Sequence, residues 1–496
     1  MKKFVSDKSA LALAAVMLVI GKAMAAISKI PLSAALGASG FGVYCAAFPL
    51  FGFTTTLSSG GISACVSAAV ANDDVAPSEK TLSFLTKLAL TVSALFAAAL
   101  FFAADAIAGA QGFLQCSPVY RALCPAVAIC AVEAVIKGVI CGKRRFLRSA
   151  AAEMTGQTVK AALVPLLACL ATALCPERAA PLSAIGVVIS ETTSLAVLLA
   201  AKRKASLPDG ECDKKAAVRL LIKSLPVALT GVLAPLLSLA DSFIIPNVLL
   251  ARSGAEHAAA LYGVKEAVAG AILSLPASVY AAAYSYFLPK LSSKEGQNDF
   301  TKVIGCFFCA GLALFAALYS LADCAVSFLF PSLDPFLADK AVSLIRIGAA
   351  GAFFSAITQA FSALFHSRGK TGAVFFVRAA CGALRAAACF FLTRLFGVGG
   401  AALSQVLSAA VSACVTSVIG ALRLSPDVSV KRLIRPTASC VIFCVFLIAA
   451  KPAFSALPPF FCAALSLITA IFAAALPLLY GFIFKKRQKN APTDLS

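Results

Sequence analysis

Charged side chains inside long apolar runs are the residues of this sequence most able to carry chemistry. A charge at the centre of a membrane-spanning helix costs roughly 2.5–3.5 kcal/mol on insertion scales, so each such residue needs a partner or a ligand. Lys22 and Lys29 lie seven residues apart in one apolar run and therefore project from nearly the same helix face. Two cations on one face indicate a hydrated cavity that binds an anion. The structural alternative is that Lys22 pairs with a distant carboxylate such as Asp241.

Other intramembrane charges fall into two groups. Besides Lys22 and Lys29, the residues predicted to bind the substrate are Lys160, Asp241 and Arg385. The residues predicted to act as a gate or to couple transport to an ion are Glu133, Lys137, Lys265 and Glu266. For this second group, a purely structural role remains an alternative. Glu133 and Lys137 are four residues apart and can pair on one helix face, and Lys265 and Glu266 can simply mark the outer mouth.

The cationic excess among these buried charges favours an anionic substrate. Phosphates suit Lys and Arg because both side chains form charge-assisted hydrogen bonds with phosphate oxygens. With the cytoplasm negative, outward movement of an anion gains about 2.3 kcal/mol per charge per 100 mV. An exporter of organic cations should instead show a cavity dominated by carboxylates.

Motifs for catalysis or for a bound cofactor are missing from the sequence. No GxxxxGK[ST] phosphate-binding loop occurs, and two histidines cannot supply a metal cluster or serve a nucleophile. The single CxxC, Cys306 to Cys309, lies inside an apolar run and indicates reduced packing residues. We therefore expect no enzyme activity, no metal and no cofactor, with coupling to the membrane potential, H⁺ or Na⁺ left open.

The composition places these charges in a helical membrane protein. Of 496 residues, 60% are hydrophobic and 13% charged, whereas soluble domains carry about 45–50% and about 25%. These values exclude a soluble multidomain enzyme, and the continuous apolar runs argue against a porin-type barrel, whose strands alternate. Polar breaks predict about fourteen membrane spans. The spans are residues 9–34, 41–70, 81–105, 119–142, 148–173, 181–201, 217–246, 258–287, 300–322, 336–365, 371–394, 398–422, 432–452 and 457–484.

Charge in the loops predicts the orientation. With the N-terminus inside, about 28 Lys and Arg fall on the cytoplasmic side and about 6 outside, as the positive-inside rule requires. The net charge of +21 is explained by this rule and needs no nucleic-acid partner. We expect both termini in the cytoplasm and the chain in the bacterial cytoplasmic membrane.

A weak internal repeat predicts two halves. VYCAAFPLFGFTTTLSSGGISA around Tyr44 aligns with LYGVKEAVAGAILSLPASVYAA around Tyr262, each at the start of the second helix of its half. Two six-helix lobes related by a pseudo-two-fold axis along the membrane normal, with two further C-terminal helices, are the expected all-α fold. The expected parts are an N-terminal lobe (1–204), a cytoplasmic linker (205–215), a C-terminal lobe (216–424), two helices (425–484) and a basic tail (485–496).

Four segments resemble the stage V sporulation protein B group of polysaccharide-type flippases. They are KIPLSAALGASGFGVYCAAFPLFGFTTTLSSGGISACVSAAVA (Lys29–Ala71), KGVICGKRRFLRSAAAEMTGQTVK (Lys137–Lys160), SLPVALTGVLAPLLSLADSFIIPNVL with Pro226, Pro235, Asp241 and Pro246, and LYG…LPASVYAAAYSYFLPKLS (Leu261–Ser292). The sequence departs from that group's pattern at Lys137, Cys141 and Gly156, where the group has Arg, Gln and Glu.

This group belongs to the multidrug/oligosaccharidyl-lipid/polysaccharide exporter superfamily, which includes MurJ-type lipid II flippases. The resemblance implies two lobes around a central cavity, alternating access and a polyprenyl-diphosphate-linked sugar as cargo. It also implies that Lys22 takes the place of a basic residue that lines the cavity in MurJ-like relatives. Their basic residues on the second and eighth helices have no clear equivalent here.

The sequence thus predicts a flippase for a lipid-diphosphate-linked saccharide, such as a peptidoglycan or sporulation cell-wall precursor. Its expected partners are that lipid, membrane lipids and cell-wall synthesis enzymes. Two alternatives remain. One is an ion-coupled exporter of small organic cations, and the other is a non-transporting membrane scaffold for cell-wall enzymes.

Overall fold

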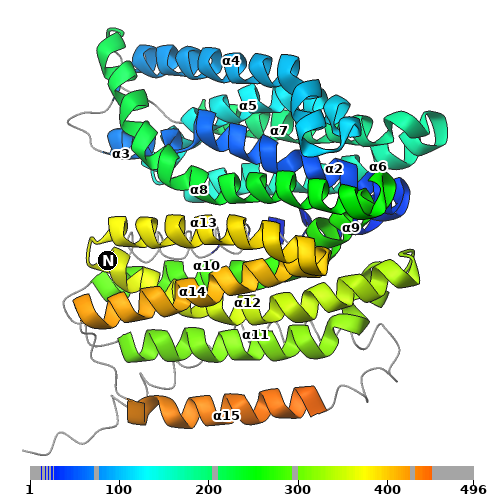
Figure 1. Cartoon of the computed structure of the whole chain (residues 1–496). Coiled ribbons are helices and arrows are strands. Elements are labelled where there is room, and N and C mark those ends of the chain that lie inside the picture. The colour runs from blue at the N-terminus through cyan, green and yellow to red at the C-terminus, as the bar shows by residue number, and fades with distance from the viewer. Residues whose placement is uncertain are drawn as a thin grey trace, which may run out of the picture. The chain divides into compact units, whose positions relative to one another are not determined.

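The computed structural model describes residues 27–71, 77–203, 210–292, 300–424 and 430–449, with isolated positions between 13 and 25. Every regular element in these ranges is a helix (Figure 1). Lys22, residues 205–209 of the predicted linker, the last predicted span and the basic tail lie outside the described residues.

The longer helices follow the apolar runs of the sequence. They are α2 (Lys29–Ser59), α3 (Ile62–Ala71), α4 (Glu79–Gln111), α5 (Ser117–Gly142), α6 (Phe146–Leu174), α7 (Ala179–Lys202), α8 (Lys214–Ser253), α9 (Ala255–Gly263), α10 (Gly270–Ser292), α11 (Phe300–Leu329), α12 (Pro335–Ser367), α13 (Thr371–Phe396), α14 (Val398–Leu424) and α15 (Val430–Ala449). Single turns η2 (Leu114–Cys116) and η3 (Pro176–Arg178) precede α5 and α7, and the π-helical turn η4 (Val264–Ala269) joins α9 to α10.

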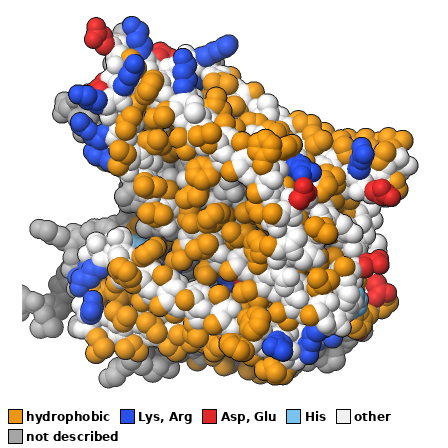
Figure 2. Space-filling model, turned by 45° about the horizontal axis from the view of Figure 1, so that its top comes forward, with side chains coloured by type: hydrophobic (Ala, Val, Ile, Leu, Met, Phe, Trp, Pro, Cys, Tyr) orange, Lys and Arg blue, Asp and Glu red, His pale blue; other side chains and the backbone are white. Residues whose placement is uncertain are grey.

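Eleven helical segments in the described ranges are long and apolar enough to cross a membrane, and they correspond to the second to twelfth predicted spans. The chain is therefore a multi-pass membrane protein. The total of fourteen spans and the pseudo-two-fold axis stay predictions. Figure 2 shows hydrophobic side chains over most of the visible surface. Phe102 (82% exposed) and Leu422 (78%) have the exposure expected of lipid-facing residues.

Two predicted spans are interrupted in the structure. Within the span predicted over 41–70, α2 ends at Ser59 and α3 begins at Ile62, because Gly60 is extended and Gly61 has a positive φ of 81°. The span predicted over 258–287 contains the π-helical turn η4. A third irregularity is a kink inside α2, where Gly37 has φ 67° and ψ 173°. Only glycine adopts the backbone angles of Gly37 without strain.

Contacts divide the chain into two units, Met1–Ala267 and Val268–Ser496. In the N-terminal unit, α2 packs against α5, α6, α8 and α9, and it is the central helix of this unit. The helix α8 belongs with this unit because it also packs against α3 and α4. The predicted boundary at the linker therefore differs from the contact boundary, which falls inside η4, and the predicted lobes stay a prediction.

The C-terminal unit is built around α11 and α12, which pack against each other. On α12 lie α10 and α14, α13 packs on α14, and α15 packs on α11. Buried thiols join α15 to α11: Cys440 donates to the Cys309 carbonyl oxygen at 3.3 Å, and Cys444 donates to that of Leu312 at 3.4 Å. The described cysteines are all free thiols.

Candidate functional site

A cavity of about 560 Å³ lies among the helices of the N-terminal unit. Its walls come from α2, α6, α8 and the turn η4, and its charged lining residues are Lys29, Lys160 and Glu266. We call it the lysine cavity. Two of the predicted substrate-binding residues and one predicted gate residue therefore line one cavity, although they are far apart in the sequence.

The wall from α2 is aromatic because of the spacing of its residues. Phe41, Tyr44 and Phe48 recur every three or four residues and so lie on one helix face, which lines the cavity. Lys29 lines the same cavity from the other side of the kink at Gly37. One helix therefore supplies both a cation and an apolar surface.

Lys160 reaches this wall from α6. Its ammonium nitrogen lies 5.6 Å from the centroid of the Phe48 ring, within the range of a cation–π contact. Among the described residues, neither Lys29 nor Lys160 forms a salt bridge. The lysine cavity thus presents two ammonium groups with no paired carboxylate, as an anion-binding site requires.

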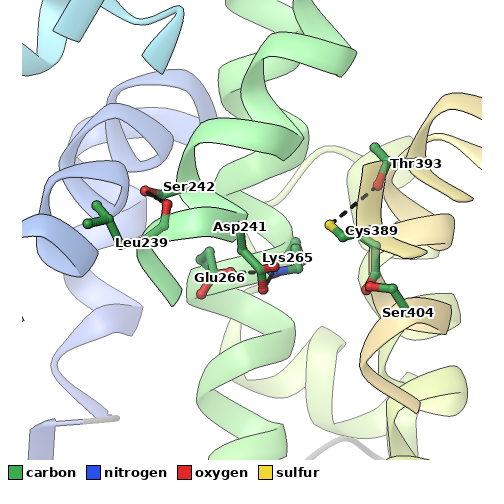
Figure 3. Close-up of polar contacts among 9 residues, drawn as sticks. Leu239, Asp241, Ser242, Lys265, Glu266, Cys389, Thr393 and Ser404 are labelled. Atoms are coloured by element: carbon green, nitrogen blue, oxygen red, sulfur yellow. Dashed lines mark hydrogen bonds and ion pairs between the residues drawn. The ribbon is translucent and has the colours of Figure 1, made fainter. Parts of the chain in front are cut away.

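Behind the cavity lies a buried ion-pair cluster of Asp241, Lys265 and Glu266 (Figure 3). The ammonium of Lys265 pairs with Glu266 and lies 4.0 Å from the Asp241 carboxylate. The Lys265 and Asp241 side chains are only 5% and 3% exposed, whereas that of Glu266 is 33% exposed and lines the cavity. Asp241, predicted to bind substrate, is thus held by Lys265 away from the lining.

The π-helical turn η4 carries two of these three residues, Lys265 and Glu266. Single π turns inside helices occur frequently at functional sites, because they re-aim neighbouring side chains. Here Lys265 is buried while its neighbour Glu266 faces the lysine cavity. The sequence marks both charges but contains no signal for the π turn.

A second, smaller cavity of about 210 Å³ lies among α5, α6 and α7 in the same unit. Its charged lining residues are Glu133, Lys137, Glu153 and Glu191, and we call it the carboxylate cavity. Lys137 pairs with Glu153 of the neighbouring helix. The expectation that Lys137 pairs locally with Glu133 is therefore wrong, because interhelical packing offers a nearer carboxylate.

One group of ligand atoms in the carboxylate cavity is close enough to share a cation. The Cys130 thiol and the carboxylates of Glu133 and Glu191 lie within 4.8 Å of one another. The lining carries three carboxyl groups against one lysine. The sequence reasoning missed Cys130, Glu153 and Glu191 as site residues. Glu153 and Glu191 lie inside predicted spans and so are charges that need a partner, and Cys130 lies three residues before Glu133 on one helix face.

The one remaining predicted substrate-binding residue in the described ranges lies elsewhere. Arg385 is on α13 in the C-terminal unit, where it is half-buried. Also in that unit, Arg346 pairs with Asp323 and stacks on Tyr319 at 5.9 Å, so its charge has a structural partner.

These features define a class of protein. The helical architecture, with its many membrane-spanning segments, is the fold of solved structures of a MurJ lipid II flippase and of a MATE family transporter. Within this class, the chain belongs to the polysaccharide biosynthesis protein family, whose profile matches residues 8–292, more than half of its length. The family predicted from the four sequence segments is thereby confirmed.

Solved structures show the same fold. The structure of "Lipid II flippase MurJ, inward closed conformation" matches with a TM-score of 0.71 at 13% identity, covering 98% of this chain and all of the other. An inward-facing multidrug resistance MATE family transporter matches with a TM-score of 0.63 at 16% identity, covering 84% and 98% of the two chains. A MOP superfamily transporter from Pyrococcus furiosus, described by the reverse polarity of its binding pocket, matches at 0.59 and 16%, covering 84% and 96%. No curated protein sequence is significantly similar to the chain.

Proposed function

We propose that this protein is a flippase for a polyprenyl-diphosphate-linked saccharide, such as a peptidoglycan or sporulation cell-wall precursor. It would move this lipid from the inner to the outer leaflet of the bacterial cytoplasmic membrane by alternating access, with both chain termini in the cytoplasm. The observation that carries the proposal is the lysine cavity, in which Lys29 and Lys160 lie beside an aromatic wall and form no salt bridge with any residue that the structure describes.

The chemistry of the cavity fits a diphosphate headgroup. Two ammonium groups neutralise a diphosphate through charge-assisted hydrogen bonds, and the apolar walls strengthen these bonds by lowering the local dielectric constant. A cavity of about 560 Å³ has room for the diphosphate group itself. The polyprenyl chain would stay in the lipid, where its transfer requires no cavity.

A second candidate function is ion-coupled export of small organic cations. The observation that favours it is the carboxylate cavity, whose three carboxyl groups against one lysine would attract a cation. It ranks second because the larger cavity carries the opposite charge. A change in the cellular accumulation of a cationic dye on expression would support it. A non-transporting scaffold instead predicts that substitutions in both cavities are silent.

Binding of lipid II tests the proposal directly. In native mass spectrometry with lipid II and a neutral-headgroup lipid as competitors, the wild type should retain lipid II selectively. Lys160→Gln should lose at least about tenfold in lipid II affinity, because a charge-assisted hydrogen bond contributes roughly 1.5–3 kcal/mol.

The matched control is Lys340→Gln. Lys340 is exposed, and its ammonium lies 5.3 Å from the Phe336 ring, a contact like that of Lys160 with Phe48. This variant should bind lipid II as the wild type does. Equal retention of both lipids by the wild type would contradict the proposed substrate.

We further propose that the carboxylate cavity couples transport to H⁺ or Na⁺. Replacing Glu133 with Gln removes one carboxylate from the group that could share a cation. In proteoliposomes, an imposed H⁺ or Na⁺ gradient should accelerate lipid flipping by this variant about tenfold less than flipping by the wild type. Its lipid II affinity should change less than twofold. A wild-type response to both gradients would exclude Glu133 as the coupling residue.

A further inference from the structure

We propose that Glu191 is the resting counter-ion of Lys160: it neutralises the Lys160 ammonium when the lysine cavity is empty and yields it to the diphosphate when substrate binds. This inference rests on the proposed function, since it concerns the same cavity, and it assigns a role to a residue outside the lysine cavity.

One face of α6 lines both cavities. Ser149, Glu153, Gly156 and Gln157 line the carboxylate cavity, and Lys160 and Val164 continue the same three- and four-residue spacing into the lysine cavity. Lys160 follows Gln157 by three residues, about one helical turn. It therefore stands where the two cavities approach each other along α6.

Two close contacts show which residues of α7 lie opposite this face of α6. A Cβ placed on Gly156 would lie 2.9 Å from the Ser194 Cβ, and one on Gly186 would lie 3.0 Å from the Val164 side chain. The two helices thus run antiparallel and meet four residues before and four residues after Lys160. Interpolation between these contacts places Lys160 at the level of residue 190, the residue before Glu191.

The Glu191 carboxylate lines the neighbouring carboxylate cavity, where it lies within 4.8 Å of the Glu133 carboxylate and the Cys130 thiol. Glu191 lies outside salt-bridge distance of Lys160, so a ligand in the cavity can approach the ammonium more closely than this carboxylate does.

A transporter that carries its substrate one way must return empty. After release of the diphosphate, a lysine in an apolar cavity without any counter-charge would disfavour the empty state, since an uncompensated charge in the membrane costs roughly 2.5–3.5 kcal/mol. A carboxylate nearby, but not in contact, lowers this cost and weakens substrate binding by competing for the same ammonium. Glu191 should therefore raise the rate of the return step at the expense of affinity.

The test measures binding of farnesyl diphosphate, as a short prenyl diphosphate, to the full-length protein by isothermal titration calorimetry in detergent. Glu191→Gln should lower the Kd about fivefold to tenfold, whereas Lys160→Gln should raise it at least tenfold. The double variant should match Lys160→Gln, because the carboxylate acts only through this lysine. Glu191→Asp, which keeps the charge, should behave as the wild type.

Glu153→Gln is the matched control, because it removes the same charge from the same cavity, but from the residue that pairs with Lys137. It should change the Kd less than twofold. In a flipping assay, Glu191→Gln should lower both KM and kcat, since substrate binds more tightly and the empty protein returns more slowly. A purely structural role of Glu191 would not lower KM.

The outcomes separate the two proposals. If the wild type binds farnesyl diphosphate in a Lys160-dependent way but Glu191→Gln equals Glu153→Gln, the counter-ion role is overturned and the proposed function stands. If the wild type binds farnesyl diphosphate no better than farnesol, both proposals are overturned.

Discussion

Replacing Lys29 and Lys160 together with Gln is expected to lower the rate of lipid II flipping at least about 100-fold. Each lysine is proposed to hold the diphosphate by charge-assisted hydrogen bonds, which contribute roughly 1.5–3 kcal/mol apiece. Loss of two such contacts corresponds to roughly 3–6 kcal/mol, and every 1.4 kcal/mol is a factor of ten. The rate is measured in proteoliposomes with a fluorescent lipid II analogue and a membrane-impermeant quencher.

The single variants place the effect on the cavity. Lys29→Gln and Lys160→Gln should each lower the rate about tenfold or more, while Lys340→Gln should leave it unchanged. All variants should unfold at the wild-type temperature, because neither cavity lysine forms a salt bridge among the described residues. Wild-type flipping by the double variant would exclude the lysine cavity as the diphosphate site.

Replacing Lys265 with Met is expected to destabilise the protein severely. The substitution leaves Asp241 and Glu266 without their shared cation, and removal of one partner from a buried ion pair costs about 3–5 kcal/mol. The variant should unfold at a markedly lower temperature in detergent, as followed by loss of helical circular dichroism. Adding Asp241→Asn to Lys265→Met should restore part of the stability, because one stranded carboxylate is removed.

A matched pair in the same unit shows the effect of burial. Lys137 pairs with Glu153, but both side chains are 38% exposed. Lys137→Met should therefore cost no more than about 1 kcal/mol, the range of exposed ion pairs. Equal destabilisation by Lys137→Met and Lys265→Met would show that burial of the ion pairs around Lys265 does not raise the cost of breaking them.

Membrane spans could be predicted from the sequence because lipid selects for continuous apolar runs that satisfy their backbone hydrogen bonds internally. The same argument cannot find irregular backbone inside such a run. Gly60–Gly61 interrupts one predicted span, and the π turn at Val264–Ala269 interrupts another, yet each lies in a segment that is long and apolar enough to span a membrane. Hydropathy measures how favourably side chains transfer into lipid, and it does not show where the backbone hydrogen bonds of a helix become irregular.

The site was predictable in part for a related reason. A charge inside an apolar run marks a residue with a special role. For this reason the sequence predicts Lys29 and Lys160 as binding residues, and the structure places both in one cavity. Which charges meet depends on how helices pack side by side, and sequence spacing records only neighbours on one helix. The pairing of Lys137 with Glu153 and the proximity of Glu133 to Glu191 could not be predicted for that reason.

The pairing of Lys265 with its sequence neighbour Glu266 has a consequence for biosynthesis. Two adjacent opposite charges can pair within a single nascent helix, so the segment that contains η4 can leave the translocation channel as a nearly neutral unit. Asp241 lies earlier in the chain, on helix α8, and pairs with Lys265 once the two segments pack together. The two segments should therefore enter the bilayer together as a helical hairpin, and α8 synthesised alone should insert poorly.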